Sequence, residues 1–446
     1  MTLIKENTMF FGRNKFKFVF IGAGSTVFTL NLAGDILTEE SITGGSLVLV
    51  DIDEKKLDEA ARGVKELVAH TGKNFTVEAH PHFSTALDNA DFVFFTYAVG
   101  SIESWKEDIE ICTAHGVLQS VGDTIGPGGM IRIMRSIPLA LEITRKMEEV
   151  CPDAYIVNYT NPEGAQCFAI QKYSRIRCFG LCHGTPNMAE SLAEEVFKVD
   201  KKRFRYEAAG VNHLTWFTKM TIDGKDVYPE LENALNSSGF AKKEPISHDL
   251  YRIFGLYPAP QDRHVSEFFS AFMRDRVLKE KDYYWKNNTF KEVDRWRDQD
   301  RVHLEALIHD HKGYENFLQG SGETATHFIR ALSTGEITTE MVNVPNRGYI
   351  RNISDDVIVE VPAYIDSFGI HPQGGITLPE GIAARCDSLG REYRLLVEAA
   401  INCDLKLFLE AAYLDPLCAN CDYPEQLVLD LIQRNLHLLP EGWRKR

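Results

Sequence analysis

The chain has 446 residues, 44% of them hydrophobic, which is enough for the buried cores of two or three domains. Its 49 Lys and Arg residues are outnumbered by 64 Asp and Glu residues, giving a net charge of −15. A surface of that sign repels nucleic-acid phosphates and anionic lipid headgroups. We therefore expect neither nucleic acid nor membrane as a partner.

The N-terminus and the cysteines indicate a cytoplasmic protein. Charged residues interrupt the few apolar residues of the first 15 positions, so no signal peptide is expected: Lys5, Glu6, Arg13 and Lys15. No apolar run reaches the roughly 18 residues that a membrane-spanning helix needs. The nine cysteines lack the spacing of a disulfide framework and fit a reducing compartment. We interpret Cys178 and the Cys418–Cys421 motif as structural.

Residues 16 to about 200 alternate short apolar segments with longer amphipathic ones, as in β-α-β units. Strands are predicted over 16–21, 47–50, 92–96, 156–159 and 179–181, with helices ending near 37 and over 54–70. Because the strands are almost wholly apolar, they predict a parallel sheet covered on both faces. The fold class expected for residues 1–202 is α/β, a Rossmann-type doubly wound sheet.

The pattern changes at about residue 204. Strand-like alternation over 211–222 is followed by helical segments from 233 to about 334, a β-rich segment over 342–361 and a closing helical pair. Residues 203–446 are therefore predicted to form a second, α+β domain packed across the mouth of the first.

A glycine turn directly follows the first predicted strand, in Phe18-Val-Phe-Ile-Gly22-Ala-Gly24-Ser25. Bare backbone at Gly22 and Gly24, with Ser25 at the start of a helix, lets a dinucleotide pyrophosphate approach closely. Val27 occupies the third glycine position of the usual fingerprint, so the turn alone is weak support.

A carboxylate at the end of the second strand strengthens this prediction. Asp51 stands 27 residues after Gly24, near the spacing that places an acid on the adenosine ribose, and Asp53 is the alternative. An acid there repels a 2′-phosphate, so we expect NAD rather than NADP as the cofactor.

Two polar segments follow later strands, Gly180-Leu-Cys182-His183-Gly184 and Gly210-Val-Asn212-His213. A Cys thiolate and a His imidazole can hold a borderline divalent metal while leaving positions open for substrate oxygens and water. On spacing alone, a core cysteine and a hydrogen-bonded histidine are the simpler interpretation.

Six blocks of the chain together resemble, in the same order, the motifs of glycoside hydrolase family 4. They are Gln119–Gly129, Asn158–Pro162, Cys182–Gly184, Gly210–His213, Asp262–Phe268 and Asn343–Gly348. The resemblance implies a Rossmann-type domain with an α+β domain, NAD⁺ and a divalent metal, typically Mn²⁺, as cofactors, and a homodimer or homotetramer. It also implies hydrolysis by a redox-neutral elimination rather than by two carboxylates.

In the implied mechanism, oxidation at C3 of the sugar makes the C2 proton acidic. Elimination then releases the aglycone, water adds, and NADH returns the hydride. Carried over by resemblance, Cys182 and His213 are the metal ligands and His183 is the acid on the leaving group. Asp262 is the candidate base, with His264 or Tyr257 as alternatives.

Two further residues are expected to contact ligands. The resemblance places Asn161 against sugar hydroxyls close to the nicotinamide. Asp123 lies in a Gly-rich loop whose backbone amides could cradle the cofactor or the sugar.

The residue after the cysteine indicates the substrate class. Phosphosugar-specific members carry Asn or Asp there, whereas His183 resembles the branch that acts on unphosphorylated α-glycosides. Within that branch, the Cys182-His183-Gly184 form resembles the α-glucuronidase type. Gly184 in place of Glu removes an anion that would repel a C6 carboxylate. Arg263 is the candidate cation for that carboxylate. Glucuronide and galacturonide are not separated, and neutral α-glucosides or α-galactosides stay open.

Two other functions compete with this interpretation. A 2-hydroxy-acid dehydrogenase has a similar Asn-Pro turn and catalytic His, but the segment around Asn161 lacks the expected Asp-x-x-Arg. A non-catalytic NAD-binding sensor would need an effector or DNA-binding module, which the sequence does not suggest.

Overall fold

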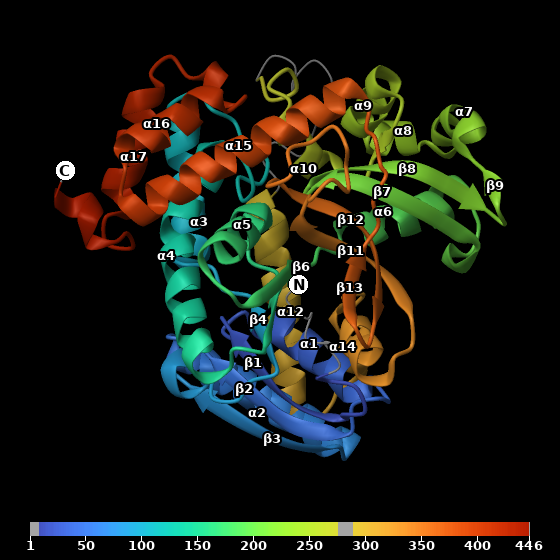
Figure 1. The fold of residues 1–446 in the computed structure, drawn as a ribbon, viewed down its shortest axis with the longest axis vertical. Helices are drawn as coiled ribbons and strands as arrows, with labels where there is room; N and C mark the ends of the chain where they lie inside the picture. The colour runs from blue at the N-terminus through green and yellow to red at the C-terminus, as the bar shows by residue number, and fades with distance from the viewer. Residues whose placement is uncertain (1–8, 275–288, 446) are drawn as a thin grey trace, which may run out of the picture.

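The structure is a computed structural model that describes residues 9–274 and 289–445. The first eight residues, on which part of the signal-peptide prediction rests, lie outside the described residues. In the described chain one sheet of 13 strands runs through the molecule. Its main path is β10-β8-β7-β12-β11-β6-β5-β4-β1-β2-β3, with β13 and β9 at its margins (Figure 1).

The first half of the chain supplies six parallel strands. They are β1 (Lys15–Ile21), β2 (Gly44–Val50), β3 (Asn74–His80), β4 (Phe92–Phe95), β5 (Tyr155–Asn158) and β6 (Arg177–Gly180). Every residue of β4 and β5 is buried, and the rings of Phe20 and Phe94 stack at 5.0 Å across neighbouring strands. The predicted parallel sheet, buried on both faces, is confirmed.

Helices of the first half cover this sheet: α1 (Thr26–Thr38), α2 (Glu54–Thr71), α3 (Ser101–Ala114), α4 (Gly126–Val150), α5 (Glu163–Tyr173) and α6 (Gly184–Ser191). Local sequence explains the bounds of α2. Asp53 caps its start by accepting a hydrogen bond from the Lys56 N–H, and Gly72 ends it in the left-handed conformation. Strand β3 was not predicted, because only Phe75 of its seven residues is buried.

The second half adds antiparallel strands to the same sheet: β7 (Phe204–Val211), β8 (Leu214–Ile222), β9 (Lys225–Asp226), β10 (Tyr257–Pro258), β11 (Thr338–Pro345), β12 (Ile358–Asp366) and β13 (Gly369–Pro372). Strand β11 joins β6 where Asn343 pairs with Gly180. Strand β12 joins β7 where Glu360 pairs with Gly210. The sheet therefore runs unbroken past residue 202, where we predict the domain boundary.

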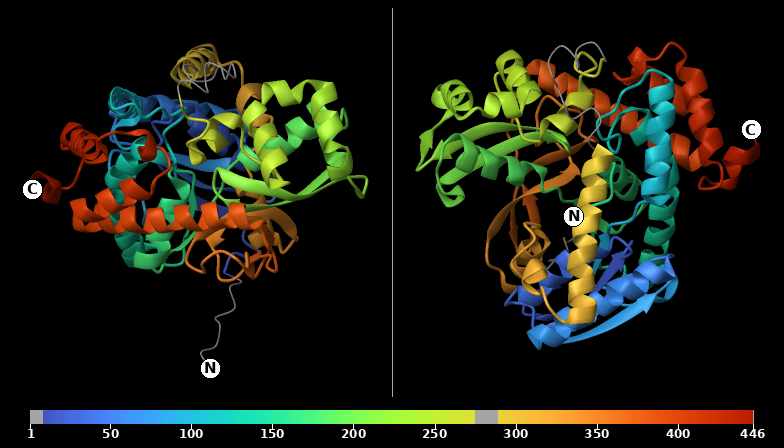
Figure 2. Two further views of the ribbon diagram at one scale, coloured as in Figure 1. Left: turned by 90° about the horizontal axis from the view of Figure 1, so that it is seen from above. Right: turned by 180° about the vertical axis from the view of Figure 1, so that it is seen from behind.

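Helices of the second half flank the sheet: α7 (Tyr228–Ser238), α8 (Phe240–Lys243), α9 (Pro245–Phe254), α10 (Asp262–Val265), α12 (Thr289–Asp310), α13 (Glu315–Leu318), α14 (Ala325–Thr334), α15 (Glu380–Asn402), α16 (Leu405–Leu414) and α17 (Pro424–Asn435). Helix α15 packs on α4 and α5 of the first half. Helix α12 runs along the opposite side of the molecule and packs on α2 (Figure 2). Because helices of the second half pack on helices of the first, these contacts do not separate two domains at residue 202. The predicted domain boundary there stays a prediction.

The polar segments gather at one end of the first-half sheet. Cys182–Gly184 follows β6, Asn212 and His213 form the turn between β7 and β8, and Asp123 precedes α4. All nine cysteines have free thiols. Among the helices that the structure describes, none combines the length and apolar character needed to cross a bilayer.

Candidate active site

The glycine turn after β1, which we predict to bind the dinucleotide, packs tightly against the segment that follows β4. Gly22 has φ +96°, and a Cβ there would lie 2.5 Å from the backbone of Tyr97. Ser25 occupies the N-cap position of α1 without a side-chain capping bond, and its side chain is exposed. The close approach of Tyr97 accounts for glycine at position 22.

Asp51 lies directly against this turn. Its Oδ2 accepts the Gly24 N–H at 2.7 Å, and its Oδ1 accepts the Asp53 N–H at 2.9 Å. The alternative acid, Asp53, instead caps α2 and is therefore committed to the helix. Asp51 and Asp53 are the two candidate acids for binding the adenosine ribose. Of these, only Asp51 contacts the glycine turn.

Three side chains from separate elements meet in one cluster: Asp123, His213 and His264. One potential ligand atom of each lies within 4.8 Å of the others. The imidazoles of His213 and His264 are 4.2 Å apart between ring centroids. One carboxylate and two imidazoles form a donor set that suits a divalent transition metal. We call these three residues the donor cluster.

Thr124 fixes the orientation of His213. The Thr124 hydroxyl donates to Asp123 Oδ1 at 2.8 Å and lies 2.6 Å from His213 Nδ1. Because a hydroxyl has one hydrogen and the carboxylate can only accept, Nδ1 of His213 donates to Thr124. This leaves Nε2 of His213 with a free lone pair, as a metal ligand requires.

Burial sets the charges of the donor cluster. It lowers the pKa of His213 and of His264, so both imidazoles are neutral near pH 7. Burial opposes ionisation of Asp123, but His213, His264, Arg132 and the Thr124 hydroxyl together hold the Asp123 pKa below its usual range. Neutral imidazoles and an ionised carboxylate are the protonation states in which these groups bind metal.

Glu267 holds the loop that carries Asp123. Its Oε1 accepts the N–H groups of Val121 and Gly122 at 2.8 and 2.9 Å, and its side chain is buried. This contact joins the Asp262–Phe268 block to the Gly-rich loop and explains why both motifs belong to one site.

The amides of the Gly-rich loop are mostly committed to the protein. Besides the two bound by Glu267, the Gly128 N–H donates to Gln119 Oε1 at 2.9 Å and the Gly126 N–H donates to Asp415 Oδ2 at 3.0 Å. The expectation that this loop cradles a ligand with its amides is wrong for these four groups, because each already has an acceptor. The Asp123 carboxylate is the part of the loop that faces the site.

Cys182 and His183 lie next to the donor cluster without belonging to it. The Cys182 sulfur accepts the Gly184 N–H at 3.4 Å. Burial and the nearby Glu360 raise the pKa of the Cys182 thiol, so it holds its proton in the absence of a metal. His183 Nδ1 lies 2.9 Å from Glu323 Oε1, and this contact raises the pKa of His183.

Glu360 ties together the two segments that carry the predicted metal ligands. The hydroxyls of Thr185 and Thr215 each donate to its carboxyl group at 2.8 Å. Burial raises the pKa of Glu360 to about 7. The carboxyl group thereby connects the start of α6, after Cys182, to the strand that follows His213.

Asp262, the predicted base, binds the start of α9. It accepts the Ile246 N–H at 2.8 Å and the Ser247 N–H and hydroxyl at 2.7 and 2.6 Å. Burial raises its pKa to about 6. The alternative Tyr257 is fully buried, whereas His264 lies in the donor cluster.

The predicted substrate contacts surround the cluster. Asn161 Nδ2 donates to Asp123 Oδ2 at 3.0 Å. The Arg263 guanidinium lies 5.3 Å from the centre of the Trp296 ring, and its charge opposes protonation of His213. Nη1 of Arg132, beside Asp123, is buried without a hydrogen-bond partner among the described residues. Sequence reasoning did not select Arg132, which no motif marks.

Comparison with known proteins identifies the family. Residues 17–198 match the model of the family 4 glycosyl hydrolases, and residues 208–418 match that of their C-terminal domain. An alpha-galactosidase of Rhizobium meliloti is 32% identical over 96% of this chain and 89% of its own length. An alpha-galacturonidase of Lachnoclostridium phytofermentans is 30% identical over 96% and 97%.

A solved structure supports the same relationship. A 6-phospho-alpha-glucosidase from gut microorganisms, in complex with NAD and glucose-6-phosphate, is 25% identical, with a TM-score of 0.80 over 96% of this chain and 99% of that one. These matches span both halves and decide against the dehydrogenase and sensor alternatives. The chain belongs to family 4 of the glycosyl hydrolases.

Proposed function

We propose that this enzyme hydrolyses unphosphorylated α-glycosides, specifically α-hexuronides, with NAD and a divalent metal such as Mn²⁺ as cofactors. The observation that carries the proposal is the donor cluster, with His183, Arg132 and Arg263 around it. Two guanidinium groups beside a sugar-binding site favour an anionic sugar.

The residues present fit both cofactors. The turn at Gly22 and Gly24 with Asp51 would hold NAD, and His213 with Asp123 would hold the metal. Cys182 stays a predicted metal ligand. Because the pKa of its thiol is raised, the free thiol is protonated and must lose that proton when it binds the metal. When bound, NAD accepts hydride from C3 of the sugar and the metal acts as a Lewis acid.

The side chains of this chain supply the proton transfers. Once C3 is a ketone, a base removes the C2 proton and His183 protonates the departing oxygen. Resemblance assigns the base to Asp262, which has a pKa of about 6. Asp262 is already occupied by three bonds to the start of α9, whereas Nδ1 of His264 is buried without a hydrogen-bond partner among the described residues. With Asp123 and His213 as the metal ligands, these contacts favour His264 as the base. Deuterium exchange at C2 in Asp262→Asn and His264→Asn separates the two.

Among hexuronides, galacturonide has the stronger support. The relatives named above are an alpha-galactosidase and an alpha-galacturonidase, which share the galacto configuration. Because one of these relatives is an alpha-galactosidase, a neutral α-galactoside is the second candidate substrate. Arg263 and Arg132 argue for the uronate, because a guanidinium can bind a carboxylate through two hydrogen bonds.

The test compares p-nitrophenyl α-galacturonide, α-glucuronide, α-galactoside, α-glucoside and 6-phosphoglucoside at matched concentrations, with NAD⁺, Mn²⁺ and a thiol. We expect the galacturonide to be hydrolysed fastest and Arg263→Ala to lower the uronide-to-neutral ratio about ten- to a hundredfold. Faster turnover of a neutral hexoside by the wild type would overturn the uronide assignment. An unchanged ratio in Arg263→Ala would remove Arg263 from it.

We also propose that the enzyme works in the reducing cytoplasm as a homodimer or homotetramer. Nine free thiols, one of them a predicted metal ligand, support the reducing compartment.

A further inference from the structure

His183 has one buried acidic partner. Its Nδ1 lies 2.9 Å from Glu323 Oε1, and the two residues are 140 positions apart in the chain. The His183 side chain is 55% exposed, whereas that of Glu323 is 7% exposed. The carboxylate is therefore the enclosed member of the pair and the imidazole the open one.

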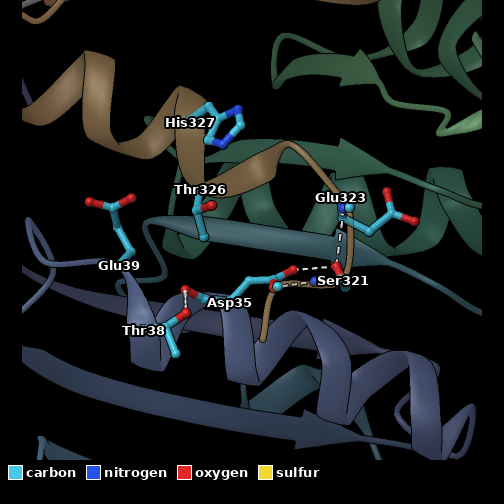
Figure 3. A pocket seen from close by; sticks show the side chains of 9 residues that line it. Asp35, Thr38, Glu39, Ser321, Glu323, Thr326 and His327 are labelled. Carbon is cyan, nitrogen blue, oxygen red and sulfur yellow. Dashed lines mark hydrogen bonds between the residues drawn. The ribbon is translucent and has the colours of Figure 1, made fainter. Parts of the chain in front are cut away.

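The loop that carries Glu323 is tied to α1. Ser321 donates to Asp35 through its hydroxyl and through its N–H at 2.9 Å, and the Glu323 N–H donates to the Ser321 hydroxyl at 3.1 Å. Figure 3 shows this chain of bonds from Asp35 to the Glu323 backbone, beside a cavity of about 270 Å³ between α1 and α14. Asp35 is buried. The bonds hold Glu323 against the helix that begins at the nucleotide turn.

The pairing fixes how the imidazole is turned. A carboxylate accepts from Nδ1–H, so Nε2 is the nitrogen left for another group. A positive charge on His183 opposes protonation of His213, so the two imidazoles belong to one site. A half-exposed imidazole without such a partner would sample several rotamers.

We propose that Glu323 is a positioning residue for cleavage of the glycosidic bond: it holds His183 so that Nε2–H points at the leaving oxygen. The proposal rests on the proposed function, in which His183 protonates that oxygen. As the C1–O bond breaks, its electron pair goes to the leaving oxygen, which takes the proton from Nε2. The electrons of the broken C2–H bond become the C1=C2 double bond.

The test varies the leaving group. For the wild type we expect the oxidation and deprotonation steps to limit the rate on aryl α-glycosides, so that the rate depends only weakly on aglycone acidity. In Glu323→Ala, the phenyl glycoside, which needs the acid, should lose on the order of 10²-fold in kcat, while the 2,4-dinitrophenyl glycoside changes little. Glu323→Gln, whose amide oxygen can still accept Nδ1–H, should restore most of the phenyl rate.

A second measurement excludes a merely structural effect. In D₂O, slow departure of the aglycone lets the deprotonated sugar recapture deuterium, so recovered phenyl glycoside should carry more C2 deuterium with Glu323→Ala than with the wild type. If Glu323→Ala does not fold, Glu323→Asp takes its place, because the side chain is shorter by one methylene. Its kcat should then depend steeply on aglycone acidity. Glu340→Ala is the matched control, because Glu340 of β11 also pairs with a histidine, its Oε1 lying 2.6 Å from His327 Nδ1 in α14.

The outcomes distinguish failure of the positioning role of Glu323 from failure of the acid role of His183. If His183→Ala shows the steep leaving-group dependence and the Glu323 variants do not, Glu323 has no positioning role. If His183→Ala lowers kcat by the same factor for every aryl glycoside, His183 is not the acid and the proposed mechanism fails. Equal losses on both aglycones in Glu323→Ala, or the same slope in Glu340→Ala, would also overturn the role of Glu323.

Discussion

Replacing Glu267 by Ala should weaken the fold and the metal site together. The buried carboxyl group accepts two backbone N–H groups, at 2.8 and 2.9 Å, through the same oxygen. Each buried donor left without an acceptor costs about 1–3 kcal/mol, so the two together cost about 2–6 kcal/mol of unfolding free energy. Gly122 directly precedes Asp123, so release of its N–H also frees the carboxylate of the donor cluster.

The assay combines urea unfolding with titration of Mn²⁺, followed by electron paramagnetic resonance of the free ion. We expect Glu267→Ala to bind Mn²⁺ roughly 10- to 100-fold more weakly, as for losses of groups that orient ligands. Glu267→Gln keeps an accepting oxygen and should lie near the wild type. Asp404→Ala is the control, because Asp404 also accepts two backbone N–H groups but at the start of α16. Wild-type Mn²⁺ affinity in a folded Glu267→Ala would refute the reasoning.

Three further predictions test other parts of the site. Gly22→Ala should raise the NADH dissociation constant at least about tenfold in a fluorescence titration, because the added Cβ would lie 2.5 Å from the Tyr97 backbone; an unchanged constant would contradict it. Burial raises the Glu163 pKa to about 8, so the native state binds the extra proton and the unfolding free energy should fall as pH rises from about 4.5 to 8. Glu163→Gln should flatten that slope in urea unfolding across the same range, and an equal slope would count against it. Mn²⁺ affinity should rise with pH because the Cys182 thiol must lose its proton, and Cys182→Ser should respond less to pH; parallel curves would remove Cys182 from the site.

Patterns of burial in the sequence predict much of the first half. Strands β1, β2, β4, β5 and β6 are apolar along most of their length, so their periodicity is unambiguous, and Gly22 and Asp51 follow two of them directly. Strand β3 escapes the same reasoning because it lies at the edge of the sheet with one buried residue.

Contacts between distant loops could not be predicted from local patterns. Gly122 and Glu267 are 145 positions apart, and their bond depends on how the β-rich second half folds against the first. His264 is one of three candidate bases in the sequence, because nothing there indicates that its ring lies 4.2 Å from that of His213. Asp262, two positions earlier, looks equally reactive in the sequence but is bound by the start of α9. Motif order located these segments, and their pairing came from the structure.

Loss of the C2 hydrogen during hydrolysis distinguishes the proposed elimination from direct displacement at C1. The most direct measurement is hydrolysis of p-nitrophenyl α-galacturonide in D₂O with NAD⁺, Mn²⁺ and a thiol, reading deuterium at C2 of the released sugar by NMR. We predict one deuterium at C2 and no net consumption of NAD⁺. Turnover that leaves the original hydrogen at C2 would contradict the elimination mechanism and require direct displacement at C1.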